Sequence, residues 1–383
     1  MSDNSFLPRR LRLAREARGF TTTGLAEAIG ISRQTASSWE NGEYAPKPEI
    51  LQRIATLLDF PVRFFFRPCP SPNAGAPYFR KLSAVTARGR TQASAKLDLL
   101  AEFAEYLAEE VEFPKSNLPD FDIGKDPGSV SEDDIEHIAA KTRLFFCLGK
   151  GPISNITQLL ENNGVLISRF QMTTEGLDAF SRWINGIPYV LNNSSRASGV
   201  CRTRFNLAHE LGHLIMHRSI TPNQRTLGII ESQANRFASA FLMPAETYIS
   251  DFSYPSLDVF LSLKQKWLSS VASQIVRCRD LDIILDNVYS RLFANLNRRG
   301  WRTIEPLDGE LPQEIPKLLE KAILVLEKEG LFSRHDLLSN YVLPSQDVVD
   351  FAGLPFDFFD EQRIESTPVV KKRTKILSFA KGA

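Results

Sequence analysis

The stretch FNLAHELGHLIMH, residues 205–217, places two histidines and a glutamate at the spacing H-E-x-x-H among apolar residues. This mixture predicts a buried helix, on which residues four apart share one face and lie about 6 Å apart along the axis. His209 and His213 can therefore hold one tetrahedral zinc ion, while Glu210 can take a proton from an activated water. Because an ordinary amphipathic helix can carry the same spacing by chance, a third ligand is needed to identify a metal site.

A second predicted helix supplies that ligand. In ESQANRFASAFLMP, Glu231 begins the helix, and Asn235 lies one turn later on the same face. Catalytic zinc usually has three protein ligands and one open position, so we predict a site of His209, His213 and Glu231, with Asn235 orienting a ligand from behind. His217 lies roughly 12 Å along the axis from His209. It is too far away to share the ion and is expected to pack in the core or to support a ligand.

The two stretches RTRFNLAHELGHLIMH and ESQANRFASAFLMP together resemble the ImmA/IrrE-type metallopeptidases, zinc peptidases that cleave repressor proteins. The resemblance implies His209, His213 and Glu231 as metal ligands and Glu210 as the catalytic carboxylate. It also gives a role to IPYVLNN, residues 187–193, because an edge strand in this family can hold an extended substrate by main-chain pairing. The resemblance covers most of residues 135–310.

The N-terminal region carries a different motif. The run TTTGLAEAIGISRQTASSWENG predicts a helix, a turn at Gly30 and a second helix capped by Ser32. It resembles the helix-turn-helix of phage-repressor-like XRE regulators over about residues 8–66, which implies a double-stranded DNA operator as a partner. The second helix would enter the major groove, and the residues predicted to contact bases or phosphates are Arg33, Gln34, Ser37 and Ser38.

The charge of this N-terminal segment is modest for a DNA-binding domain. Residues 1–67 contain nine arginines, Lys47 and seven acidic residues, a net charge of +3. We therefore expect a homodimer, in which two segments share the binding. A helical bundle used only for protein contact is the alternative interpretation.

The remaining pattern predicts a multidomain, mainly α protein with a small α+β part. We expect an all-α helix-turn-helix domain over residues 1–67 and a linker with a connecting helix over 68–130, the linker proper being the Pro/Gly/Ser-rich stretch 67–77 and the helix 92–112. A zincin-like metallopeptidase domain with a small antiparallel sheet should follow over 131–250. A helical region with a basic tail should occupy 251–383. Asn185-Gly186 predicts a β-hairpin within the sheet.

Composition excludes several classes of protein. The four cysteines lie far apart, which argues against a disulfide framework and against a thiolate zinc site. No apolar run approaches the roughly 20 residues that span a bilayer, and no signal peptide is visible. The expectation is a cytoplasmic protein without membrane contact.

These observations predict a DNA-binding transcriptional regulator that carries a zinc metalloendopeptidase domain. Its activity should be conditional and should cleave a repressor-type protein, either this chain or a partner, to relieve repression. Two alternatives stay open. The peptidase-like domain can be a sensor that does not cleave, or the helix-turn-helix of a protease can serve only to recognise a protein.

Overall fold

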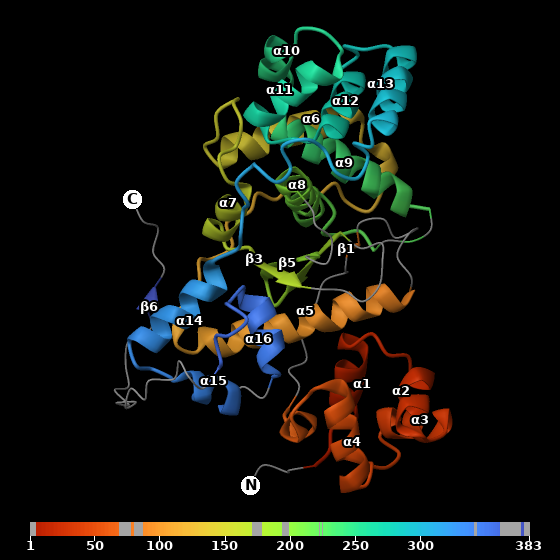
Figure 1. Ribbon diagram of the computed structural model, residues 1–383, viewed down its shortest axis with the longest axis vertical. Helices are drawn as coiled ribbons and strands as arrows, with labels where there is room; N and C mark the ends of the chain where they lie inside the picture. Colours follow the sequence, from red (N-terminus) through yellow and green to blue (C-terminus); the bar gives the residue numbers. More distant parts are fainter. Residues whose placement is uncertain are drawn as a thin grey trace.

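The structure is a computed structural model, and it describes residues 5–68, 78–79, 87–170, 178–193, 199–221, 223, 225–340, 343–360 and 377–378 of the 383-residue chain. The described part is mainly helical with a small sheet. In Figure 1 the long helix α5, Ala87–Ala108, crosses the middle of the molecule, with an N-terminal helical bundle below it and the sheet above it.

The N-terminal bundle, here called the head (residues 5–68), contains the predicted helix-turn-helix. Thr21 and Ser32 cap the two helices of the motif, because their hydroxyls accept the N–H groups of Gly24 at 2.9 Å and Thr35 at 3.1 Å. Gly30 ends the first of them at a positive φ of 71°. The elements of the head are α1 Pro8–Ala17, α2 Thr22–Ile29, α3 Arg33–Asn41, α4 Pro48–Leu58 and the 3₁₀ helix η1 Val62–Phe66.

The sheet contains four described strands in the order β1–β4–β5–β3. Strands β4 and β5 form the predicted hairpin, and Asn185 and Gly186 turn the chain with positive φ values of 50° and 78°. The strands are β1 Tyr78–Phe79, β3 Leu166–Phe170, β4 Ala179–Ile184 and β5 Ile187–Asn193.

Two expectations about this sheet are wrong. The sheet is mixed and not wholly antiparallel, because β3 lies parallel to β5 while β1 and β4 pair antiparallel. The hairpin occupies one side of β5, so β3 can add only to the other side. For the same reason the strand IPYVLNN is not an edge strand: β5 lies between β3 and β4. The strand beside which a chain segment adds is β4, and the segment paired there is β1.

Alternation along the strands gives the sheet two different faces. Phe180, Tyr189 and Leu191 face a hydrophobic core shared with α5, whereas Val190 faces a second core that contains α8. Ser181, one residue after Phe180, therefore points to the side of α8. The sheet thus separates the two cores of the protein and presents one face to each helix.

The second core is built by the helices that lie above the sheet in Figure 1. Ser131 and Asn155 cap the first two of them. The helices are α6 Glu132–Phe145, α7 Ile156–Asn162, α8 Val200–Met216, α9 Leu227–Leu242, α10 Ala245–Asp251, α11 Leu257–Trp267, α12 Val271–Asp280 and α13 Asp286–Arg298, with the 3₁₀ turn η2 Pro127–Ser129 before them.

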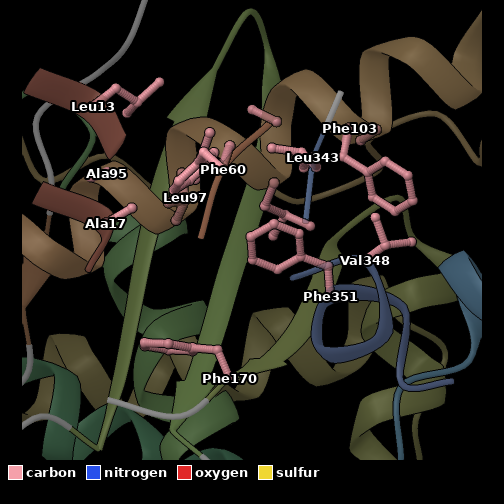
Figure 2. Packing of buried hydrophobic residues seen from close by; sticks show 14 of the residues in the cluster. Leu13, Ala17, Phe60, Ala95, Leu97, Phe103, Phe170, Leu343, Val348 and Phe351 are labelled. Atoms are coloured by element: carbon pink, nitrogen blue, oxygen red, sulfur yellow. The ribbon is translucent and has the colours of Figure 1, made fainter. Parts of the chain in front are cut away.

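The first core joins segments from both ends of the chain. Figure 2 shows Leu13 and Ala17 of the head, Ala95 and Leu97 of α5, and Val348 and Phe351 near the C-terminus as parts of one cluster. The region predicted as one helical segment after residue 250 is therefore divided between the two cores. Its later helices, which belong to the first core with α5, are α14 Leu318–Lys328, α15 Arg334–Asn340 and α16 Ser345–Ala352.

The connection between the head and α5 differs from the predicted one. The connecting helix was expected over 92–112, but α5 ends at Ala108, and the buried Val111 begins the short strand β2, Val111–Glu112, which pairs with β6, Leu377–Ser378. Of the predicted linker 67–77, residues 69–77 lie outside the described residues, as does the basic tail apart from β6.

Candidate metal centre

Helix α8 carries three of the predicted site residues in its buried middle. His209, Glu210 and His213 are each 0% exposed. One helical turn brings the two imidazoles onto the same face, so that Nε2 of His209 and Nε2 of His213 lie 3.0 Å apart.

Helix α9 brings Glu231 to these imidazoles. Its Oε1 lies 3.3 Å from Nε2 of His213, and its Oε2 lies 3.6 Å from Nε2 of His209. The two helices can approach closely because Gly212 has no side chain: a Cβ there would lie 2.9 Å from the ring of Phe237 on α9. The only candidate metal-binding group found among the described residues is this set of His209, His213 and Glu231.

The donor atoms have the chemistry and the spacing of a zinc site. Zinc bonds of about 2.0–2.1 Å to nitrogen and oxygen in a tetrahedron place two ligand atoms about 3.3 Å apart. The observed separations of 3.0, 3.3 and 3.6 Å fall around this value. Two imidazoles and one carboxylate form the donor set of a catalytic zinc site with one open position. The residues present therefore fit the ion.

Asn235 lies behind the first histidine, as predicted. Its Oδ1 is 3.0 Å from Nδ1 of His209, so the amide oxygen can accept a hydrogen bond from that ring nitrogen. A proton held on Nδ1 leaves Nε2 as a lone pair directed at Glu231 and His213.

Ser181 contacts Glu210 and was not predicted. The hydroxyl of Ser181 donates a hydrogen bond of 2.6 Å to Oε2 of Glu210, and both side chains are buried. The strand pattern FSRW could have indicated that this serine faces the helix, but only the packing of β4 on α8 identifies its partner. The contact fixes one carboxylate oxygen of Glu210.

His217 is also buried, at 0% exposure, and contacts the second histidine. Its Nδ1 lies 2.9 Å from Nδ1 of His213, and its Nε2 lies 3.2 Å from Oε1 of Gln233. Burial lowers the pKa of His217 well below its usual value, and the neighbouring His213 lowers it further. The ring is therefore neutral at neutral pH.

A cavity of about 1380 Å³ opens beside Glu231 and Asn235. It extends along α9 toward α12 and α13 and is lined by both charged and aromatic side chains, among them Arg202, Phe205, Arg236, Phe293 and Trp301. Of the three candidate ligands, Glu231 lines this cavity, and its side chain is 15% exposed.

The predicted DNA-contact residues lie on α3, but not all of them face solvent. Arg33 and Gln34 are exposed in its first turn, and Ser37 is half-buried. Ser38 is only 8% exposed because it lies on the face of α3 that packs into the head. The prediction that Ser38 contacts DNA is inconsistent with this packing, and we remove it from the set.

Comparisons with known proteins identify both domains. A family model described as helix-turn-helix matches residues 11–65, and one described as IrrE N-terminal-like domain, a peptidase family, matches residues 160–277. The second match contains His209, Glu210, His213 and Glu231.

Two curated relatives match the head. They are uncharacterized HTH-type transcriptional regulators of Sinorhizobium medicae (strain WSM419) and Rhizobium meliloti (strain 1021). Each is 35% identical over 66 residues, which is 17% of this chain and 48% of the relative. The chain thus spans about half the length of the curated relatives that it matches.

A membrane-spanning helix was not found: within the described ranges, each helix is too short or too polar to cross a bilayer.

The geometry of α8 and α9 and the match to the peptidase family agree on the character of the central region. This chain therefore carries an N-terminal XRE-type helix-turn-helix domain followed by an IrrE-like, metallopeptidase-type domain.

Proposed function

We propose that this protein is a DNA-binding transcriptional regulator with a zinc-dependent endopeptidase activity that cleaves a repressor-type protein. The observation that carries the proposal is the convergence of His209, His213 and Glu231, with the buried Glu210 next to His209 in α8. Zinc bound there would polarise the scissile carbonyl and activate the attacking water.

Glu210 is the general base in this proposal. Its carboxylate follows the first ligand directly in α8, and it can take a proton from the attacking water and pass it to the leaving amine. Ser181 orients this carboxylate through the 2.6 Å hydrogen bond to Oε2. Because both groups are buried, the hydrogen bond is protected from competition by water.

The outer side of β4, where the two described residues of β1 pair opposite Phe180 and Ser181, is the proposed binding place for the substrate backbone. Strand addition to a sheet edge uses main-chain hydrogen bonds and so accepts an extended segment of many sequences. The antiparallel pairing of Tyr78 with Ser181 supports this edge, since a backbone already adds to β4 opposite the residue that contacts Glu210. An extended segment of a repressor, or of this chain between the head and α5, is the expected substrate.

The head supplies the DNA contact. Arg33 and Gln34 are exposed at the start of α3, where they suit guanine and adenine in the major groove. Cleavage between the head and α5 would weaken operator binding, because two heads linked through a dimer gain affinity from their effective concentration. We therefore propose a homodimer on a double-stranded operator.

The decisive experiment compares the wild-type full-length chain with Glu210→Gln, each incubated with zinc alone and with candidate repressors. Only wild type is expected to yield fragments, including one of about residues 1–70 if the chain cuts itself. Mass spectrometry of the products identifies the bond cleaved.

Two results would contradict the proposal. Cleavage by Glu210→Gln at the wild-type rate would remove Glu210 from the mechanism. Zinc-loaded wild type that leaves every candidate intact would favour the alternative in which the domain is a sensor that does not cleave.

A further inference from the structure

A chain of three hydrogen-bonded groups lies behind His213 and leads away from the metal centre. His217, at the end of α8, contacts His213 at 2.9 Å between the two Nδ1 atoms. Gln233 of α9 contacts the other ring nitrogen of His217 at 3.2 Å. The Nε2 of Gln233 donates a hydrogen bond of 2.7 Å to the carbonyl oxygen of Pro127 in η2. His217 and Gln233 are both buried.

The direction of these hydrogen bonds follows from the carbonyl oxygen of Pro127, the group farthest from the metal centre. A carbonyl oxygen can only accept, so the group of Gln233 that faces Pro127 must be its NH₂. The amide oxygen of Gln233 then faces His217, and it too can only accept. Nε2 of His217 therefore carries a proton and donates a hydrogen bond to the amide oxygen of Gln233.

The same reasoning extends to the metal ligand. Two ring nitrogens 2.9 Å apart share one proton, so one Nδ1 donates and the other accepts. With its proton on Nε2, the fully buried ring of His217 presents Nδ1 as the acceptor that faces Nδ1 of His213. His213 then carries its own proton on Nδ1. Its Nε2 is a lone pair that lies 3.0 Å from Nε2 of His209 and 3.3 Å from Oε1 of Glu231, as expected for ligand atoms that converge on one metal ion and not on a shared proton.

We propose that Pro127, Gln233 and His217 form a relay that holds His213 in the tautomer able to bind the metal. The inference rests on the proposed zinc site and adds two positioning residues to it, His217 and Gln233, which touch no metal or substrate themselves. With the relay, each histidine ligand has its own acceptor: Oδ1 of Asn235 faces His209, and Nδ1 of His217 faces His213. It also ties the second ligand to α9 and η2 as well as to α8.

Matched substitutions at residue 217 separate the relay from simple packing. In His217→Asn the amide oxygen can occupy the position of the imidazole Nδ1, so the acceptor for His213 is retained. In His217→Leu a side chain of comparable bulk offers no acceptor. We expect His217→Leu to weaken zinc binding by about 10–100-fold in competition with a chelator, and His217→Asn to weaken it much less.

Gln233→Leu is the second test, because it leaves both imidazoles in place. His217 is then no longer held with its proton on Nε2, and zinc affinity is expected to fall in the same direction as for His217→Leu. Ser239→Ala is the control: it removes a buried hydroxyl of α9 that makes no hydrogen bond to the described residues, and it should leave zinc affinity unchanged.

Nitrogen NMR of the metal-free protein gives a readout that does not depend on activity. With only five histidines in the chain, the ring signals can be assigned by substitution. In wild type the proton of His213 should be on Nδ1, and in Gln233→Leu it should be distributed between both ring nitrogens.

The outcomes distinguish the relay from the proposed function. Wild type that binds no zinc would refute the proposed metal site. Wild type that binds zinc, with His217→Leu and Gln233→Leu binding equally tightly and the His213 proton unmoved, would refute the relay alone.

Discussion

The metal centre and the junction, where the head contacts α5 and α16 of the body (the described residues after the head), are both built from buried polar groups. They differ in how far apart these groups lie in the sequence. In the metal centre, His209, Glu210 and His213 lie within one helical turn, and Glu231 follows on the next helix. In the junction, Arg18 at the C-terminal end of α1 and Lys96 of α5 both contact Asp347 of α16, at 2.7 and 2.6 Å. The sequence separations there are 329 and 251 residues.

The junction holds the head by its first helix. Arg10 is 0% exposed and bonds Glu102 of α5 as well as the carbonyl oxygens of Arg67 and Pro68. Because the head is held through α1, Arg33 and Gln34 on α3 stay exposed. The comparison shows that a site made from local spacing can be recognised as a motif, whereas a junction made from distant residues leaves no motif at all.

The largest expected effect concerns the metal centre. His213→Ala should purify without zinc, because two remaining ligands cannot hold the ion tightly, whereas Glu210→Gln should keep about one zinc per chain. Glu210→Gln should lose cleavage by about 10²–10⁴-fold, as expected for a general base. Metal analysis and a cleavage assay give both results, and zinc retained in His213→Ala would contradict the ligand assignment.

The second prediction breaks the junction. Asp347→Leu leaves Arg18 and Lys96 without their shared carboxylate, and loss of one partner of a buried ion pair costs about 3–5 kcal/mol. Urea unfolding followed in the head should show this loss, while zinc binding stays as in wild type.

Asp59→Asn is the matched control for the junction, since Asp59 also faces Arg18, at 3.8 Å, but is exposed. An exposed pair contributes about 0–1 kcal/mol. Equal effects of the two substitutions would show that burial of Asp347 does not matter to the junction.

The third prediction concerns the exposed residues at the start of α3 in the head. Arg33→Ala and Gln34→Ala should each weaken specific operator binding by about 1–3 kcal/mol, with a smaller loss on random DNA. Arg63→Ala removes the same charge from η1, outside the two helices of the motif, and should lower specific and random binding alike. A selection that recovers no preferred DNA sequence would instead favour a head used for protein contact.

The smallest effect is the pH dependence of the junction. Burial raises the pKa of Asp347, but Lys96 and Arg18 outweigh it, and the net pKa lies below the usual value. A lowered folded-state pKa gives stability that is present above the unfolded-state pKa of about 3.9 and is lost as pH falls toward the folded-state value.

The free energy of unfolding of wild type, measured with urea, should therefore fall below about pH 4. Asp347→Asn should make this fall with pH less steep. The exposed Glu109, which directly follows α5, provides the control Glu109→Gln, for which the pH dependence should match that of wild type. Identical slopes for wild type and Asp347→Asn would contradict a charged Asp347 in the folded protein.

Predictions from the sequence succeeded where neighbouring residues determine the structure. The cap at Ser32 and the turn at Asn185-Gly186 depend on a few consecutive residues, and each is present as expected. The predictions about the sheet failed for a different reason. Whether β5 is an edge strand, and whether β3 lies parallel to it, depends on which strands add to it from elsewhere in the chain.

By itself, the sequence determined the helix-turn-helix, the hairpin and the helices that carry His209, His213 and Glu231, because helical periodicity and capping act over a few residues. Only the tertiary structure decided that Ser181 contacts Glu210, that Gln233 reaches His217, and that Asp347 joins head and body. Each of these contacts depends on packing between elements that are separate in the chain, and hydrophobic burial, which drives that packing, is non-directional and carries no local spacing.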